Sequence, residues 1–162
     1  MFDSARQSLP PFNSGGPRWR LIFVIAYAAL LPMTLMAAAL WLPGLGARPA
    51  LAAALGSYAA LFASFVAGFH WGIGLRYMAT TSQVPTFHFV WGPVPACLAW
   101  GTLLLSPAIG LLAMVGVFAL AYGVDHRTWP GAGLKPWLSL RRQIAIGQVL
   151  CCVAGAAALA WR

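Results

Sequence analysis

One stretch of the chain, from Tyr77 to Val124, contains no aspartate, glutamate, lysine or arginine. A water-soluble domain carries charged side chains over its whole surface, so an uncharged stretch of this length indicates burial in a bilayer. The composition agrees, because 61% of the 162 residues are apolar, 7% are charged, and the mean hydropathy is +0.80. We therefore interpret the chain as an integral membrane protein. This excludes a soluble enzyme, a disordered protein and a nucleic-acid binder, despite the net charge of +8.

Five apolar runs are long enough to cross a bilayer core of about 30 Å, which takes roughly 20 helical residues. They cover about residues 21–42, 50–75, 87–105, 107–124 and 143–161. Ser106 and Pro107 mark a turn within the uncharged stretch, because proline suits the first turn of a helix. The runs do not alternate between apolar and polar residues, which favours helices over a barrel. The sequence predicts an all-α integral membrane bundle of five transmembrane helices. It forms one domain, residues 21–162, after a short N-terminal tail, residues 1–20.

Basic residues gather on one side of these five spans. Eight of the ten lysines and arginines fall there, and two fall on the other side. The eight are Arg6, Arg18, Arg20, Arg76, Arg127, Lys135, Arg141 and Arg142, and the two are Arg48 and Arg162. By the positive-inside rule we expect the N-terminus in the cytoplasm and the C-terminus outside. Arginine greatly outnumbers lysine and alanine is abundant, which is typical of a GC-rich bacterial genome and points to a bacterial inner membrane.

Two patterns concern how the helices pack. Small residues recur every fourth position in the second span, which lets helix backbones approach closely. They are Ala52, Gly56, Ala60, Ser64, Gly68 and Gly72. This stripe indicates either packing within the bundle, which we favour, or an interface between subunits. In the third span, Gly92, Pro93 and Pro95 predict a kinked or broken helix, since each proline removes a backbone donor.

Polar side chains converge on the cytoplasmic end of the predicted bundle. The candidate cluster comprises His70, Trp71, Arg76, Asp125, His126, Arg127, Trp137, Arg141 and Arg142. His88 begins the third span at the same level. Asp125 is the only acid apart from Asp3, so we expect it to pair with one of three basic residues. These are Arg76, Arg141 and Arg142.

Four interpretations of this cluster remain open. The first is structural, with an ion pair and hydrogen bonds holding the helix ends together. In the second, the basic residues bind anionic lipid headgroups. In the third, the histidines bind haem or a metal, although no spacing of cysteine and histidine supports it. In the fourth, Asp125 relays protons with His70 or His126 in a transporter.

Several short segments resemble a known family. Ser64–Gly72 is similar to its S-F-x-x-G-x-x-W-G block, and Pro95–Trp100 to its P-x-L-L-A-W stretch. Asp125–Arg127 and Pro136–Arg141 resemble two further blocks. The family is the bacterial and mitochondrial membrane family catalogued as domain of unknown function 3429, and the resemblance covers residues 20–161. It implies a small multi-pass inner-membrane protein and no known activity. It draws attention to Gly68, His70, Trp71, Asp125, Trp137 and Arg141 together.

The residues favour a protein without enzymatic activity. The predicted spans do not contain the two carboxylates that much enzyme chemistry needs. Neither a G-x-S-x-G motif nor a P-loop is present. We expect a membrane subunit or accessory protein of unknown molecular activity, and the alternative is a small-solute or proton-linked transporter. We predict no cofactor, no metal site and no nucleic-acid partner. The expected partners are the lipid bilayer, its anionic headgroups, and another membrane protein or a second copy of the chain.

Overall fold

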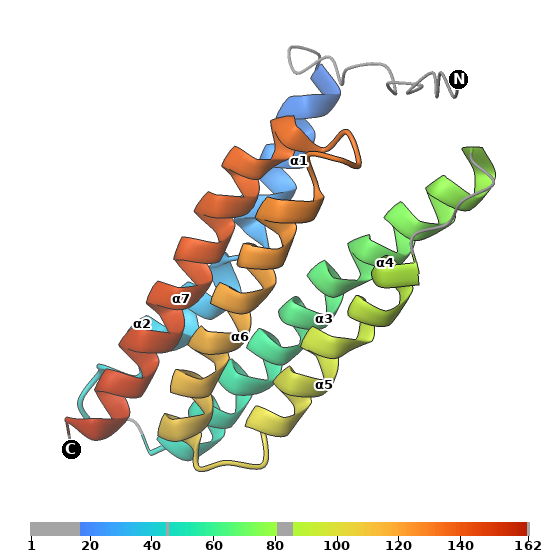
Figure 1. Ribbon diagram of the computed structural model, residues 1–162. Coiled ribbons are helices and arrows are strands. Elements are labelled where there is room, and N and C mark those ends of the chain that lie inside the picture. The colour runs from blue at the N-terminus through green and yellow to red at the C-terminus, as the bar shows by residue number, and fades with distance from the viewer. Residues whose placement is uncertain (1–16, 45, 81–85, 162) are drawn as a thin grey trace, which may run out of the picture.

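The computed structural model describes residues 17–44, 46–80 and 86–161, and every regular element among them is helical (Figure 1). The elements are α1 (Pro17–Ala28), α2 (Leu31–Ala39), α3 (Arg48–Thr80), α4 (Thr86–Trp91), α5 (Pro93–Thr102), α6 (Pro107–Thr128), a 3-10 turn η1 (Lys135–Trp137) and α7 (Leu138–Ala160). The predicted all-α fold is confirmed. Because α1 and α2 form one rod, and α4 and α5 another, the elements make five helical segments.

Four segments are long and apolar enough to cross a membrane, so the chain is a membrane protein with several candidate spans. They are residues 19–39, 48–80, 107–128 and 135–160. The expected third span, residues 87–105, is not one continuous helix. It is divided into the six residues of α4 and the ten of α5, each shorter than the roughly 20 residues that a bilayer core requires.

Proline explains both interruptions. Pro32 has no N–H for the i−4 hydrogen bond, and the chain passes through two turn residues between α1 and α2. At the second break, the Gly92 N–H still donates to the His88 carbonyl at 3.1 Å. Pro93 and Pro95 then interrupt the ladder and leave carbonyls of α4 without their helical donors. The break predicted from the Gly92, Pro93 and Pro95 pattern therefore lies at Gly92.

The helices extend further than the apolar runs. α1 begins at Pro17, so residues 17–20, which we expected in the tail, are helical, while residues 1–16 lie outside the described part. α6 continues past Val124 to Thr128, and α7 begins at Leu138 rather than at 143. Both extensions carry charged residues, and the bonds described below allow two of these to be buried. The turn at Ser106 and Pro107 is confirmed, because α6 begins at Pro107.

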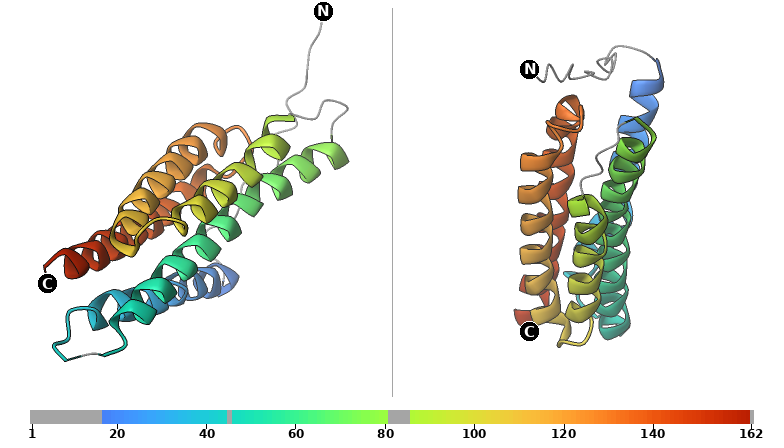
Figure 2. Two further views of the ribbon diagram at one scale, coloured as in Figure 1. Left: turned by 90° about the horizontal axis from the view of Figure 1, so that it is seen from below. Right: turned by 45° about the vertical axis from the view of Figure 1, so that its right-hand side comes forward.

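The chain runs back and forth along one axis. α6 and α7 pack against each other as an antiparallel pair, and α3, α4 and α5 form a second group beside them (Figures 1 and 2). α3 and α6 run in the same direction, because His70 near the end of α3 bonds Asp125 near the end of α6. We call this end of the bundle the Asp125 end. The broken rod α4–α5 leads from there back to the start of α6, where Leu103 lies 3.6 Å from the Cβ position of Gly56.

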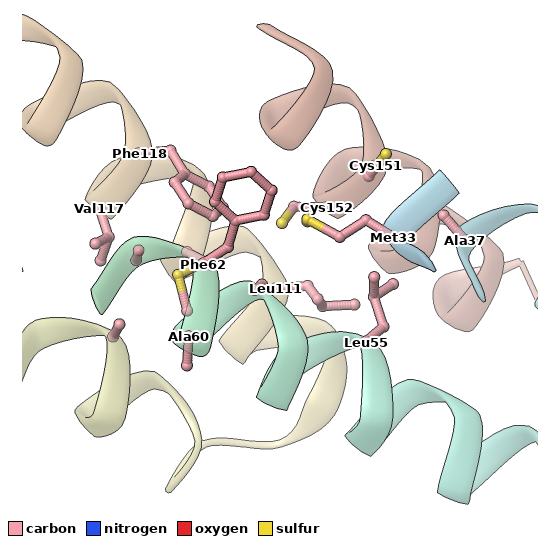
Figure 3. Packing of buried hydrophobic residues seen from close by; sticks show 14 of the residues in the cluster. Met33, Ala37, Leu55, Ala60, Phe62, Leu111, Val117, Phe118, Cys151 and Cys152 are labelled. Carbon is pink, nitrogen blue, oxygen red and sulfur yellow. The ribbon is translucent and has the colours of Figure 1, made fainter. Parts of the chain in front are cut away.

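The apolar core lies between these two groups. Phe62 of α3 and Phe118 of α6 point toward one another, with Met33 and Cys152 close to them (Figure 3). Met33 and Cys152 are fully buried, so α2 and α7 both contribute to the same core. This packing fixes α3, α6 and α7 relative to one another and so positions the polar side chains at the Asp125 end.

The stripe of small residues is divided between two surroundings. Ala52 and Ala60 are buried, and Gly56 faces Leu103, the residue that follows α5. Gly68 and Gly72 are exposed, and a Cβ at either would meet no atom within 4 Å. The first half of the stripe therefore packs inside the bundle. The second half faces outward.

Candidate functional site: a buried polar chain

Asp125 lies at the centre of a buried ion-pair network. Its Oδ2 accepts a hydrogen bond from Nε of Arg141 at 2.7 Å, and its Oδ1 lies 2.9 Å from Nε2 of His70. These residues come from α6, α7 and α3, and all three are 5% exposed or less. Arg141 is thus the partner of Asp125, out of the three basic residues that we considered. Both carboxylate oxygens are used, as a buried charge requires.

His88 extends the network to α4. Its Nδ1 lies 2.9 Å from Nδ1 of His70, and the two rings stack with centroids 5.2 Å apart. The Tyr77 ring also stacks on the His88 ring, with centroids 6.1 Å apart. His88 is 6% exposed, so it is nearly as buried as the other members. We call His88, His70, Asp125 and Arg141 the polar chain.

Hydrogen positions in the polar chain follow from the acceptors. A carboxylate only accepts, so Nε2 of His70 carries a proton and donates it to Asp125. Two nitrogens 2.9 Å apart can form a hydrogen bond only when one proton lies between them, so the two Nδ1 atoms share one. In the neutral pair that proton belongs to His88. One further proton can bind Nε2 of His88 without breaking the bond between the two Nδ1 atoms. A second would have to bind Nδ1 of His70 and would break that bond.

Trp71 and two glycines hold α4 in place. The indole N–H of Trp71 donates to the Phe89 carbonyl at 3.1 Å, which is the carbonyl that Pro93 leaves without a helical donor. The Trp71 ring lies directly over Gly92, where a Cβ would be 2.3 Å from it. At Gly74 a Cβ would be 2.7 Å from the Phe89 ring. This close contact between α3 and α4 sets the position of His88.

The other candidate residues do not join the polar chain. His126, Arg127 and Arg142 are exposed, and Arg76 is partly exposed. Trp137 is partly buried and contacts Trp19 of α1 with ring centroids 4.3 Å apart. The structure thus brings together His70, Asp125 and Arg141 from the nine residues of the cluster. Trp71 acts beside them through its bond to α4.

Sequence reasoning missed two polar contacts, one in the polar chain and one at the opposite end of the bundle. His88 lies at the same level, but only the fold of α4 against α3 shows that its ring meets His70. Arg48, which we counted only for orientation, donates through Nη2 to the Ala158 carbonyl at 2.7 Å. A cation at a helix C-terminus satisfies carbonyls that lack helical donors. Arg48 therefore ties the start of α3 to the end of α7.

The polar chain can transfer a proton between its imidazoles and the carboxylate, but it ends at Arg141. A guanidinium does not release its proton in proteins, so this residue closes the chain. Among the described residues, three or more histidines, cysteines and acids do not gather closely enough to hold a metal ion. The arrangement is suited to holding four helices together and to local proton exchange.

Comparison with known proteins gives one family. The model of a family described as "Protein of unknown function (DUF3429)" matches residues 19–157. No curated protein and no solved structure matches the chain.

Proposed function

The chain belongs to the DUF3429 family, whose function is unknown, and from that premise we propose a role based on its own residues. We propose a non-enzymatic, multi-pass protein of the bacterial inner membrane that acts as a membrane subunit or accessory protein. In this proposal α4 and α5 together make a fifth crossing. The N-terminus and the Asp125 end lie on the cytoplasmic side, as the excess of basic residues there suggests.

The observation that carries the proposal is that the charged groups of the polar chain bond one another. Asp125 bonds two side chains, and His70 bonds two, so these groups hold α3, α4, α6 and α7 together. A catalytic site instead needs groups free to meet a substrate. A buried ion pair of this kind supports a structural role, because its members are already neutralised by one another.

Gentle detergent purification tests the accessory role. We expect a second membrane protein, or a second copy of the chain, to co-elute in a fixed ratio that mass spectrometry and cross-linking can measure. The outward-facing Gly68 and Gly72 provide a variant for this experiment, because replacing both by leucine blocks close approach at an open surface. Ala53→Leu, at another exposed position of α3, is the matched control. A protein that elutes alone under all gentle conditions would contradict the proposal.

The runner-up is a proton-linked or small-solute transporter, which the row of titratable groups from His88 through His70 to Asp125 favours. The test is proton flux into vesicles that contain the purified protein and a pH-sensitive dye. Transport predicts a flux that Asp125→Asn abolishes and Arg142→Gln, at an exposed neighbouring site, leaves unchanged. If wild type, Asp125→Asn and empty vesicles are equal, proton-linked transport is ruled out.

A further inference from the structure

An apolar groove lies at the Asp125 end, beside the polar chain. It has a volume of about 400 Å³, within the roughly 300–1,000 Å³ range of ligand sites. α1 and α3 contribute half of its lining residues, including Ile25 and Phe65, and α7 contributes Ile144. Ile25 and Phe65 are 59% and 68% exposed, so the groove opens toward the side of the bundle, where a bilayer would lie.

Two hydrogen-bond donors in the wall of this groove are unpaired. Nη1 of Arg141 and Nε1 of Trp129 are buried and have no hydrogen-bond partner among the described residues. Both residues line the groove, and each is 5% exposed. An unpaired buried donor is unfavourable, and more so when it belongs to a cation. Both atoms are donors only, so they require an oxygen acceptor and not a cation or a second donor.

The charges around the groove specify the acceptor further. Lys135 and Arg142, each next in the chain to a residue that lines the groove, are exposed cations. Asp125 is the only acid among the described residues, and Arg141 already neutralises it. A ligand with one long apolar chain, an acceptor oxygen at its polar end and a negative headgroup fits this combination.

We propose that the groove is a specific site for an anionic phospholipid. One acyl chain lies against Ile25 and Phe65, and an ester or phosphate oxygen accepts from Arg141 Nη1 and Trp129 Nε1. The headgroup lies near Lys135 and Arg142. This inference rests on the membrane placement in the proposed function, but not on a protein partner or on transport.

Native mass spectrometry of the purified chain tests the site. The protein is equilibrated with equal amounts of phosphatidylglycerol and phosphatidylcholine that carry the same oleoyl chains. We expect one retained phosphatidylglycerol, at least tenfold over phosphatidylcholine. Ala26→Phe fills the groove at a lining residue of α1, so retention should fall at least tenfold. Ala28→Phe adds the same bulk at an exposed position of the same helix that does not line the groove, and should leave retention unchanged.

A second measurement does not depend on the stability of the Ala26→Phe variant. Phosphatidylglycerol with brominated acyl chains quenches nearby tryptophans, and we expect saturable quenching that is smaller in Trp129→Phe. That substitution keeps an aromatic ring and removes the indole N–H donor, so retention should also fall several-fold. Equal retention of the two phospholipids, retention of a free fatty acid in their place, or no difference between Ala26→Phe and Ala28→Phe would overturn the proposal. A failure here would leave co-elution with a protein partner unaffected.

Discussion

Asp125 allows two other polar side chains to be buried at this end of the bundle. Its two oxygens face Arg141 and His70, and the carboxyl is almost inaccessible. If Asp125 is replaced by leucine, the guanidinium of Arg141 remains buried without a counter-ion. Breaking a buried pair from one side costs about 3–5 kcal/mol, whereas replacing both members by apolar residues is often close to neutral.

We therefore expect Asp125→Leu to destabilise the protein by about 3–5 kcal/mol. Adding Arg141→Leu should restore at least half of this loss, although His70 then lacks an acceptor. Thermal unfolding in detergent, followed by tryptophan fluorescence, measures both changes. Arg142→Leu is the control, because Arg142 is exposed and outside the polar chain. If Asp125→Leu/Arg141→Leu is as unstable as Asp125→Leu alone, the loss of stability does not come from leaving the Arg141 charge unpaired.

The shared proton between His70 and His88 gives a prediction about tautomers. The acceptor Asp125 requires Nε2 of His70 to be protonated, whether the histidine pair is neutral or carries one extra proton. Nitrogen-15 NMR on His126→Gln protein, which keeps only these two histidines, should show the His70 ring protonated at Nε2 in the folded protein. In Asp125→Leu this preference should disappear. A His70 ring protonated only at Nδ1 would contradict the hydrogen-bond chain.

At this scale the sequence predicted part of the site. Asp125 is the only acid apart from Asp3, so a basic partner had to be near it. Choosing Arg141 over Arg142 requires the rotation of α7, because consecutive residues of a helix point about 100° apart. His88 could not be assigned as a partner of His70 from sequence, since the uncharged stretch gives no register between α3 and α4.

The element that carries His88 is short, and its position depends on close contact with α3. A six-residue helix contributes little stability of its own, so packing decides where α4 lies. Phe89 rests on the bare backbone of Gly74, and Trp71 covers Gly92. The same contacts explain why two glycines occur where two apolar helices meet.

We expect Gly74→Ala to destabilise the protein by about 1–3 kcal/mol, because its Cβ would lie 2.7 Å from the Phe89 ring. It should also weaken the contact between His70 and His88. Gly72→Ala is the matched control on the same helix, where a Cβ meets nothing within 4 Å, and it should be neutral or slightly stabilising. Unfolding temperatures of the two variants give the comparison. Equal losses would mean that Phe89 does not pack as described.

The helix boundaries show where pattern reading stops being informative. The breaks at Pro32 and near Pro93 follow from the missing N–H of proline, which the sequence displays directly. The apolar runs stop at Val124 and resume at Gln143, whereas α6 continues to Thr128 and α7 begins at Leu138, because a charged residue ends an apolar run without ending a helix. Asp125 and Arg141 lie inside helices, because each neutralises the other.

For the whole molecule, the shared direction of α3 and α6 sets the path of the chain between them. Both helices end at the Asp125 end, so the chain between them must return along the bundle. α4 and α5 make that return, although neither is long enough to cross alone, and α5 ends beside Gly56 near the start of α3. Four helices are each long and apolar enough to cross, because the break at Gly92 leaves α4 and α5 too short singly, and only in the proposed topology do the two together make a fifth crossing.

Cysteine labelling can test this path and the proposed orientation together. In a background with the three native cysteines replaced by alanine, we expect Ser106→Cys and Leu42→Cys to react with a membrane-impermeant maleimide added to intact cells. His126→Cys should react only after the cells are permeabilised. All three positions are exposed, and Ser106 and Leu42 lie in connections at the end opposite Asp125. If Leu42→Cys and His126→Cys both react in intact cells and Ser106→Cys reacts only after permeabilisation, α4–α5 does not cross. The reverse pattern for all three sites would retain the fifth crossing and invert the orientation.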